Sequence, residues 1–167
     1  AEEGSKMKHT ISILVENQAG VLNRISGLFS RRSFNIDSLA VGVTDDPTVS
    51  RITIIVNGDD YTVEQVTKQL NKMVDVIKLK QLDSSNDICR ELMLIKVRCN
   101  AKNRSDLIDI AQLMEAKISD LSTNSFTLEI SDTPQRLALL EEMLRPYGIL
   151  EEVRTGAIAL QHGTEVL

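Results

Sequence analysis

The order of strand-like and helix-like segments repeats once along this chain, and this repeat constrains the fold more than any other feature of the sequence. In the first half, apolar residues alternate over residues 10–16, which predicts a half-buried strand. From Val21 the spacing changes to the period of a helix, which is expected to run to about Arg32. Strands are then predicted at 36–43, 49–56 and 76–82, with a second helix before the last one, marked by Val63, Val66, Leu70 and Met73.

The second half repeats this order of elements with little residue identity to the first. Strands are predicted at residues 92–99, 118–121, 126–130 and 149–160, and the last seven residues are expected to be frayed. The helices are marked by two apolar sets, Leu107, Ile110, Ala111, Met114 and Leu137, Leu140, Leu144. We therefore expect an α+β protein of two ferredoxin-like β-α-β-β-α-β domains, each an antiparallel sheet with helices on one face.

A polar run that starts at Asp83 separates the two halves. We expect residues 1–6 to be a disordered tail, 7–82 the first domain, 83–89 a linker and 90–167 the second domain. A split β-α-β unit leaves one sheet face and its edges uncovered, and such surfaces favour association. A two-fold homodimer is the commonest solution and is the expected assembly.

The inventory of reactive side chains argues against catalysis and against a metal site. The only histidines are His9 and His162, and the only cysteines are Cys89 and Cys99, so neither a zinc ligand set nor a nucleophile-and-base pair can be assembled. Two cysteines give no disulfide framework, which fits a reducing compartment. Glu151 and Glu152 are neighbours on a predicted strand, so their side chains should point to opposite faces.

Charge and aromatic content argue against nucleic-acid binding. The formal net charge is −5, from 19 basic and 24 acidic residues, and an acidic surface repels a phosphate backbone. Three Phe, two Tyr and no Trp cannot form much of a platform for stacking bases.

The segment that joins the first strand to the first helix is the one local candidate for a binding site. Gly20 at this turn would let a small ligand approach the backbone, and the first amides of the helix could bind a carboxylate. A plain strand-to-helix turn explains the same residues, and on this pattern alone it is the favoured interpretation.

Several motifs in sequence order resemble one family. HTISILVENQAGVLNRISGLFSRRSFNIDSLAVG is similar to the ACT domain of the regulatory (small) subunit of acetohydroxyacid synthase, also called acetolactate synthase. DDPTVSRITI, KQLNKMVDVIKL, RELMLIKV and VRTGAIAL resemble the same family, so the likeness extends over residues 9–160. Ser33 stands where the family often has glycine.

The resemblance implies a regulatory subunit without an active site of its own. It would activate the thiamine-diphosphate-dependent catalytic large subunit and confer feedback inhibition by valine, possibly also leucine or isoleucine, in branched-chain amino-acid biosynthesis. Thiamine diphosphate, Mg and FAD are expected on that partner, and no cofactor in this chain. Residues 7–82 would be an ACT domain that binds effector and dimerises, and 90–167 a regulatory domain. The setting would be the bacterial cytoplasm or the plastid stroma.

The resemblance also assigns an effector site at the interface of a homodimer. One chain would contribute the loop residues and the partner chain two residues that open a strand; in order these are Asn17, Gly20, Val21, Leu22 and then Asn35, Ile36. Backbone amides at 20–22 could bind the carboxylate of valine, and the two asparagine amides could both donate and accept. Val21 and Ile36 could form the walls of the apolar slot.

Two other functions compete with this one. A stand-alone amino-acid sensor of the ACT type, acting on another partner, would share the first domain, but RELMLIKV and VRTGAIAL favour the synthase subunit. An RNA-binding protein could share the split β-α-β fold, but it needs aromatic residues on the central strands. Isoleucines occupy those positions: Ile11, Ile13, Ile52 and Ile54.

Overall fold

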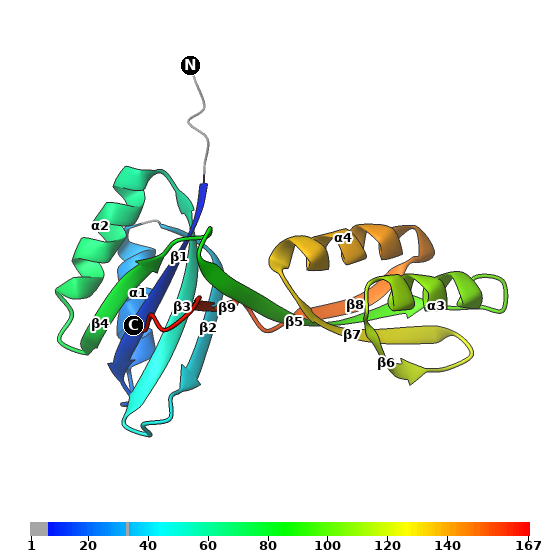
Figure 1. Ribbon diagram of the computed structural model, residues 1–167, viewed down its shortest axis with the longest axis horizontal. Coiled ribbons are helices and arrows are strands. Elements are labelled where there is room, and N and C mark those ends of the chain that lie inside the picture. The colour runs from blue at the N-terminus through cyan, green and yellow to red at the C-terminus, as the bar shows by residue number, and fades with distance from the viewer. Residues whose placement is uncertain (1–6, 33) are drawn as a thin grey trace, which may run out of the picture. The chain divides into compact units, whose positions relative to one another are not determined.

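The β-α-β-β-α-β order appears twice in the computed structural model, which describes residues 7–32 and 34–167 (Figure 1). The first set is β1 Met7–Glu16, α1 Val21–Arg32, β2 Asn35–Val43, β3 Val49–Gly58, α2 Asp60–Asn71 and β4 Val76–Leu82. The second is β5 Asp87–Arg98, α3 Arg104–Leu113, β6 Lys117–Leu121, β7 Ser125–Asp132, α4 Pro134–Leu144, a 3-10 turn Arg145–Tyr147 and β8 Ile149–Arg154; β9 Ile158–Gln161 follows. The predicted α+β class is confirmed. The expected tail 1–6 and Ser33 lie outside the described residues.

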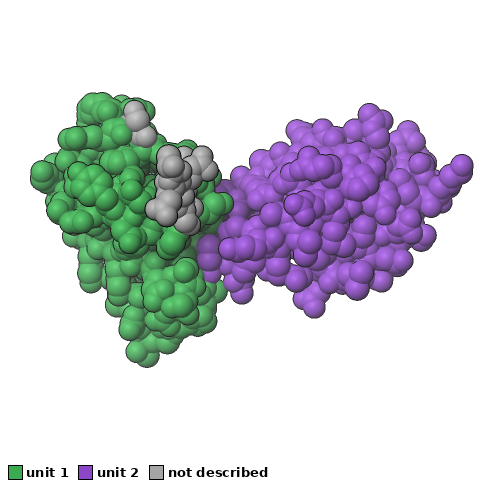
Figure 2. Space-filling view, turned by 90° about the horizontal axis from the view of Figure 1, so that it is seen from above, with its two compact units in different colours: residues 1–88, 157–167 green, residues 89–156 purple. Residues whose placement is uncertain are grey.

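The chain forms two compact units, shown in different colours in Figure 2. One runs to residue 88 and also includes residues 157–167, and the other comprises residues 89–156. This division differs from the expected boundaries in two ways. Part of the expected linker is already strand, because β5 begins at Asp87, and the last eleven residues group with the first unit rather than with the second.

The sheet of the first unit has the strand order β2-β3-β1-β4, with antiparallel neighbours. Alternate residues of its two central strands are buried on one face, and the register places Ile11 opposite Ile54 and Ile13 opposite Ile52. These side chains share one core with the apolar stripes of α1 and α2, so both helices cover this face. The core forms on this face because side chains on one side of a strand recur every second residue, and those on one side of a helix recur about every 3.6 residues. Each strand and helix of this unit therefore presents one apolar side to the other layer.

The C-terminal segment, residues 157–167, covers the opposite face of the same sheet. Arg51 Nη2 on β3 donates to the Ala159 carbonyl at 3.0 Å, and Lys80 Nζ on β4 donates to Gln161 Oε1 at 2.9 Å. The Ala157 amide donates to Ser38 Oγ on β2 at 2.8 Å. Of the seven terminal residues expected to be frayed, Gln161 and His162 are anchored by hydrogen bonds to Lys80 and to the Asn86 carbonyl, whereas residues 163–166 are exposed and form no strand.

The predicted strand 149–160 is two strands in the structure. β8 ends at Arg154, and Gly156, at φ +87°, allows a turn in the backbone before β9 begins. Ala157, directly before β9, and Ala159 within it are buried, whereas Ile158 and Leu160 are exposed.

The second unit is built in the same way, with the strand order β6-β7-β5-β8. Its core joins one face of these strands to α3 and α4, and it includes Met93, Ile95, Phe126, Leu107 and Leu137.

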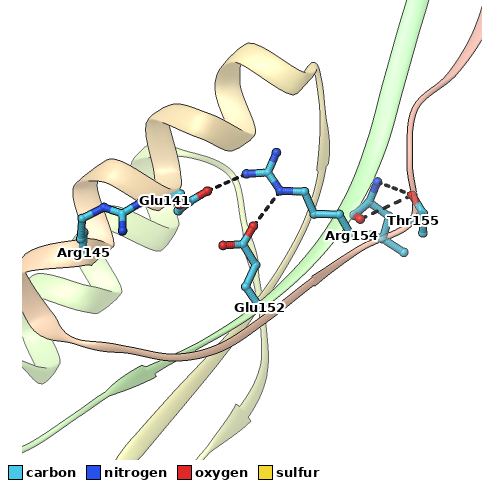
Figure 3. Close-up of polar contacts among 6 residues, drawn as sticks. Glu141, Arg145, Glu152, Arg154 and Thr155 are labelled. Carbon is cyan, nitrogen blue, oxygen red and sulfur yellow. Dashed lines mark hydrogen bonds and ion pairs between the residues drawn. The ribbon is translucent and has the colours of Figure 1, made fainter. Parts of the chain in front are cut away.

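The edge strand β8 carries an ion network on its helix-facing side (Figure 3). Arg154 donates from Nε to Glu152 at 2.7 Å and from Nη2 to Glu141 of α4 at 2.9 Å, and Arg145 also binds Glu141. Burial opposes the charged form of Arg154, but the hydrogen bond to Glu152 and the nearby carboxylates raise its pKa overall. Glu151 Oε2 instead lies 3.9 Å from Lys96 Nζ, and Lys96 is next to the core residue Ile95 on β5, so it faces the other side of the sheet. The prediction that Glu151 and Glu152 point to opposite faces is therefore confirmed.

Within residues 7–32 and 34–167, no helix has the length and apolar character needed to cross a bilayer. The same described residues contain no group of three or more His, Cys, Asp or Glu side chains placed to hold a metal ion.

Candidate functional site

The loop between β1 and α1, together with the first turn of α1, forms the candidate site that we call the 17–22 loop. Its first residue is held against the turn between β2 and β3. The Asn17 amide donates to the Thr48 carbonyl at 2.8 Å, and Asn17 Nδ2 donates to the Pro47 carbonyl at 2.9 Å. Because Nδ2 is engaged, Oδ1 is the side-chain atom of Asn17 that can accept a hydrogen bond from a ligand.

Gly20 is the last residue before α1, and its backbone conformation favours glycine. Its φ is +85°, and a Cβ at this position would lie 3.1 Å from Arg24 Nη1. The Gly20 carbonyl accepts the Arg24 amide at 3.0 Å, so the helix begins directly after it. The Val21 amide makes a long bond of 3.4 Å to the Gln18 carbonyl, whereas the next amides of the first turn have no acceptor within the helix.

Val21 and Leu22 have different environments. Val21 is 3% exposed and packs in the core of the first unit, so only its backbone is available to a ligand. Leu22 is 42% exposed and is the apolar side chain that this turn presents outward. The Val21 side chain was expected to line an effector slot, but it is buried in the core. Leu22 faces outward instead, because consecutive residues of a helix lie about 100° apart around its axis.

Asn35 and Ile36 open β2 and border a hollow of about 420 Å³ beside α1. The other residues that line it come from the second half of α1 and the residue before β2: Ser26, Phe29, Ser30 and Phe34. Phe29 and Phe34 meet edge to face, with ring centroids 6.0 Å apart. The hollow is mainly apolar, with hydroxyl and amide groups at its border, as suits a small amphipathic ligand.

Within one chain the start of the 17–22 loop and Asn35 lie at opposite ends of the sheet. Glu16 pairs with Val49 at one end of β3, and Asn35 pairs with Asn57 at the other. From residue 49 to residue 57 is eight residues of strand, or about 26 Å at about 3.3 Å per residue. The hollow itself extends toward the loop, because Ser26, which also lines it, is one helical turn from Leu22. A small ligand that contacts both Asn17 and Asn35 would therefore need a second copy of the chain.

The edge strand β2 carries apolar side chains that the helices leave uncovered. Leu39 and Val41 pair with the core residues Ile54 and Ile52, so they lie on the helix side of the sheet, yet both are exposed, as is Val43. An exposed apolar edge strand is a surface suited to association.

An ion pair that periodicity could not reveal lies beside the 17–22 loop. Arg24 binds the Asp75 carboxylate with two hydrogen bonds, Nε to Oδ2 at 2.7 Å and Nη2 to Oδ1 at 3.0 Å. The hydrogen bond from Arg24 lowers the pKa of Asp75. Asp75 stands between α2 and β4 and its side chain is 7% exposed. A spacing of 51 residues carries no local signal that would pair these two residues in advance.

Family comparisons match both halves of the chain. A family model described as an AHAS small subunit-like ACT domain matches residues 11–78, and one described as the small subunit of acetolactate synthase matches residues 90–163. The second match extends into β9, although β9 belongs structurally to the first unit.

Individual relatives are similar over nearly their whole length. The acetolactate synthase small subunit of Mycolicibacterium smegmatis is 48% identical over 155 residues, which cover 93% of this chain and 91% of that one. The probable acetolactate synthase small subunit of Archaeoglobus fulgidus is 44% identical over 95% of this chain and 99% of its own length. The crystal structure of the small subunit from Thermotoga maritima superposes with a TM-score of 0.88 at 34% identity, covering 95% of this chain and 99% of that one.

Proposed function

The chain belongs to the family of acetolactate synthase small subunits, and on this basis we propose that it regulates the catalytic large subunit of that enzyme. It activates the large subunit and makes it sensitive to feedback inhibition by valine, and leucine and isoleucine are the alternative candidates for the effector. The thiamine diphosphate, Mg²⁺ and FAD of the reaction belong to the large subunit, and this chain contributes regulation to branched-chain amino-acid biosynthesis.

One observation carries the proposal of an effector site between two chains: the separation of the 17–22 loop from Asn35 and Ile36 along β3. In a homodimer whose β2 edges face each other, the loop of one chain can lie beside the hollow of the other. The exposed apolar residues of β2 support this edge as the contact. A two-fold axis would produce two equivalent sites.

The chemistry of valine matches what the two halves of the site offer. Its carboxylate can bind the free amides in the first turn of α1, where the helix dipole favours negative charge. Its ammonium can donate to Asn17 Oδ1 and to the Asn35 side chain of the second copy. Its isopropyl group can pack between Leu22 and the apolar hollow beside Ile36. A ligand bound by two chains stabilises one arrangement of the dimer, which is how binding would reach the large subunit.

The test is calorimetric titration of the chain with L-valine, alone and together with the large subunit, with leucine and glycine as comparison ligands. We expect saturable binding of valine and a loss of this heat in Asn35→Ala. Asn71→Ala, which changes an exposed asparagine at the end of α2, is the matched control and should bind as the unchanged chain does.

Two results would contradict the proposal. No valine binding with the large subunit present would reject the effector, and full binding by Asn35→Ala would reject the site. Valine binding without any change in the rate of acetolactate synthesis would favour a stand-alone sensor instead.

A further inference from the structure

Asp75 is bonded to both ends of the 17–22 loop. At the end of β1, directly before the loop, the Glu16 amide donates to the Asp75 backbone carbonyl at 3.0 Å. In the first turn of α1, directly after Gly20, Arg24 donates two hydrogen bonds to the Asp75 carboxylate. One residue from the α2–β4 connection thus joins the strand and the helix between which the loop is suspended.

Arg24 also lies against the backbone of the loop. Its Nε and Nη2 atoms are bound to Asp75, and its third nitrogen, Nη1, lies 3.1 Å from the position that a Cβ would take at Gly20. Two hydrogen bonds to the same carboxylate fix the orientation of the guanidinium plane, whereas one ion pair without this bidentate geometry would leave the plane free to rotate. Arg24 therefore occupies the space that a side chain at position 20 would need.

We infer that Arg24 and Asp75 are positioning residues that hold the 17–22 loop in the conformation that binds the effector. This inference rests on the proposed function for the identity of the effector. Neither side chain needs to touch the ligand, because the pair acts through the backbone of Gly20 and the first turn of α1. Binding of a small ligand is sensitive to such placement, since displaced donors lose their hydrogen-bond geometry.

The exposure of this pair fits a role in the loop together with a contribution to stability. The Arg24 side chain is 50% exposed, which limits what the pair contributes to global stability, whereas the Asp75 side chain is 7% exposed. Asp75 lies in a connection and is not part of the apolar core of the first unit. Breaking the pair should therefore change the exchange of the loop amides as well as the unfolding transition.

The test uses Arg24→Gln, Asp75→Asn and the double variant in the full chain, assembled with the large subunit. Each single variant should raise the valine concentration for half-maximal inhibition by about tenfold, and the double variant should give the same shift, because both changes remove one shared contact. Arg24→Lys keeps the charge without the bidentate geometry and should recover only part of the response. Lys68→Gln removes the exposed pair with Glu64 on α2 and serves as the matched control with an unchanged midpoint.

A second measurement does not depend on valine. Hydrogen exchange of the amides of Gly20, Val21 and Leu22 should speed up in Arg24→Gln and Asp75→Asn, while the amides of β3 exchange as before. Unchanged exchange of the loop amides would overturn the inference. So would a double variant whose shift in the half-maximal valine concentration equals the product of the two single shifts. If exchange speeds up but the unchanged chain ignores valine, the positioning role stands and the proposed effector fails.

Discussion

Gly20 shows at the scale of a single residue how backbone conformation decides what the sequence can tolerate. Gly20 and Gly27 both lie near α1, but only Gly20 has a positive φ, and a Cβ at Gly27 would meet no atom within 4 Å. The two positions therefore respond to the same substitution in opposite ways, for reasons that involve no ligand.

We expect Gly20→Ala to lower the free energy of unfolding by about 1–2 kcal/mol, because alanine is strained in the left-handed region. Gly27→Ala should raise it by about 0.5–1 kcal/mol, because alanine loses less entropy in a helix interior. Urea denaturation of the two variants measures both effects. A Gly20→Ala variant as stable as the unchanged chain would contradict the φ of +85°.

The carboxyl group of Asp75 should link stability to pH. The hydrogen bond from Arg24 holds its pKa below the usual value, so the native state favours the ionised form. The resulting stabilisation is fully present above the pKa of the unfolded chain and is lost as the pH falls through the lower pKa of the folded state.

We therefore expect Asp75→Asn to show a smaller decrease in melting temperature than the unchanged chain between pH about 6 and about 3. The variant keeps part of the dependence, because hydrogen bonds also lower the pKa of Asp46, Asp59 and Asp83. Calorimetric scans across this range provide the measurement, and parallel curves for the two proteins would show that Asp75 is not linked to folding.

At the scale of the element, β2 is an edge strand whose environment is incomplete in one chain. It pairs on one side with β3 and has an open edge on the other, and three of its apolar side chains are exposed. A second copy of the chain that packed against this edge would cover these apolar side chains.

If the chain forms the homodimer proposed above through β2, Val41→Glu should convert it into monomers, because a carboxylate would be buried without a partner in the interface. Sedimentation measures the mass directly. Leu113→Glu, at the exposed end of α3 in the second unit, introduces the same charge outside the first unit and should leave the dimer intact. A dimer that survives Val41→Glu would place the interface elsewhere.

At the scale of the whole molecule, the C-terminal segment 157–167 makes the first unit discontinuous in sequence. It covers Ser12 and Thr53, which face each other across β1 and β3 and are almost fully buried on the side away from the helices. Burial of Ala157 and Ala159 and the hydrogen bonds from Arg51, Lys80 and Ala157 hold it in place.

Removal of residues 157–167 should therefore destabilise the first unit by more than about 1 kcal/mol, since each lost hydrogen bond contributes about 0.5–1.5 kcal/mol. The amides of β1 and β3 should exchange faster, while those of α3 and α4 in the second unit stay protected. Removal of residues 163–167 alone leaves β9 in place and should have a smaller effect. Equal protection of β1 in both truncated chains would show that β9 does not stabilise the sheet.

Much of this organisation could be predicted from the residues. Alternation and helical spacing identified the order of elements in both halves, but β5 begins five residues before the predicted start at 92, and the predicted strand 149–160 is two strands. The motifs that resemble the small-subunit family identified it in agreement with the comparisons. The role of the 17–22 loop stays a prediction, and the positive φ of Gly20 is a property of its turn, since Gly27 has none.

The sequence by itself determined which face of each strand and helix is apolar, because that information lies in the spacing of residues a few positions apart. Only the tertiary structure decided the pairing of Arg24 with Asp75 and the placement of Ala157 against Ser38. These contacts join residues 51 and 119 positions apart. Their partners are selected by how two layers pack in space, which local periodicity does not encode.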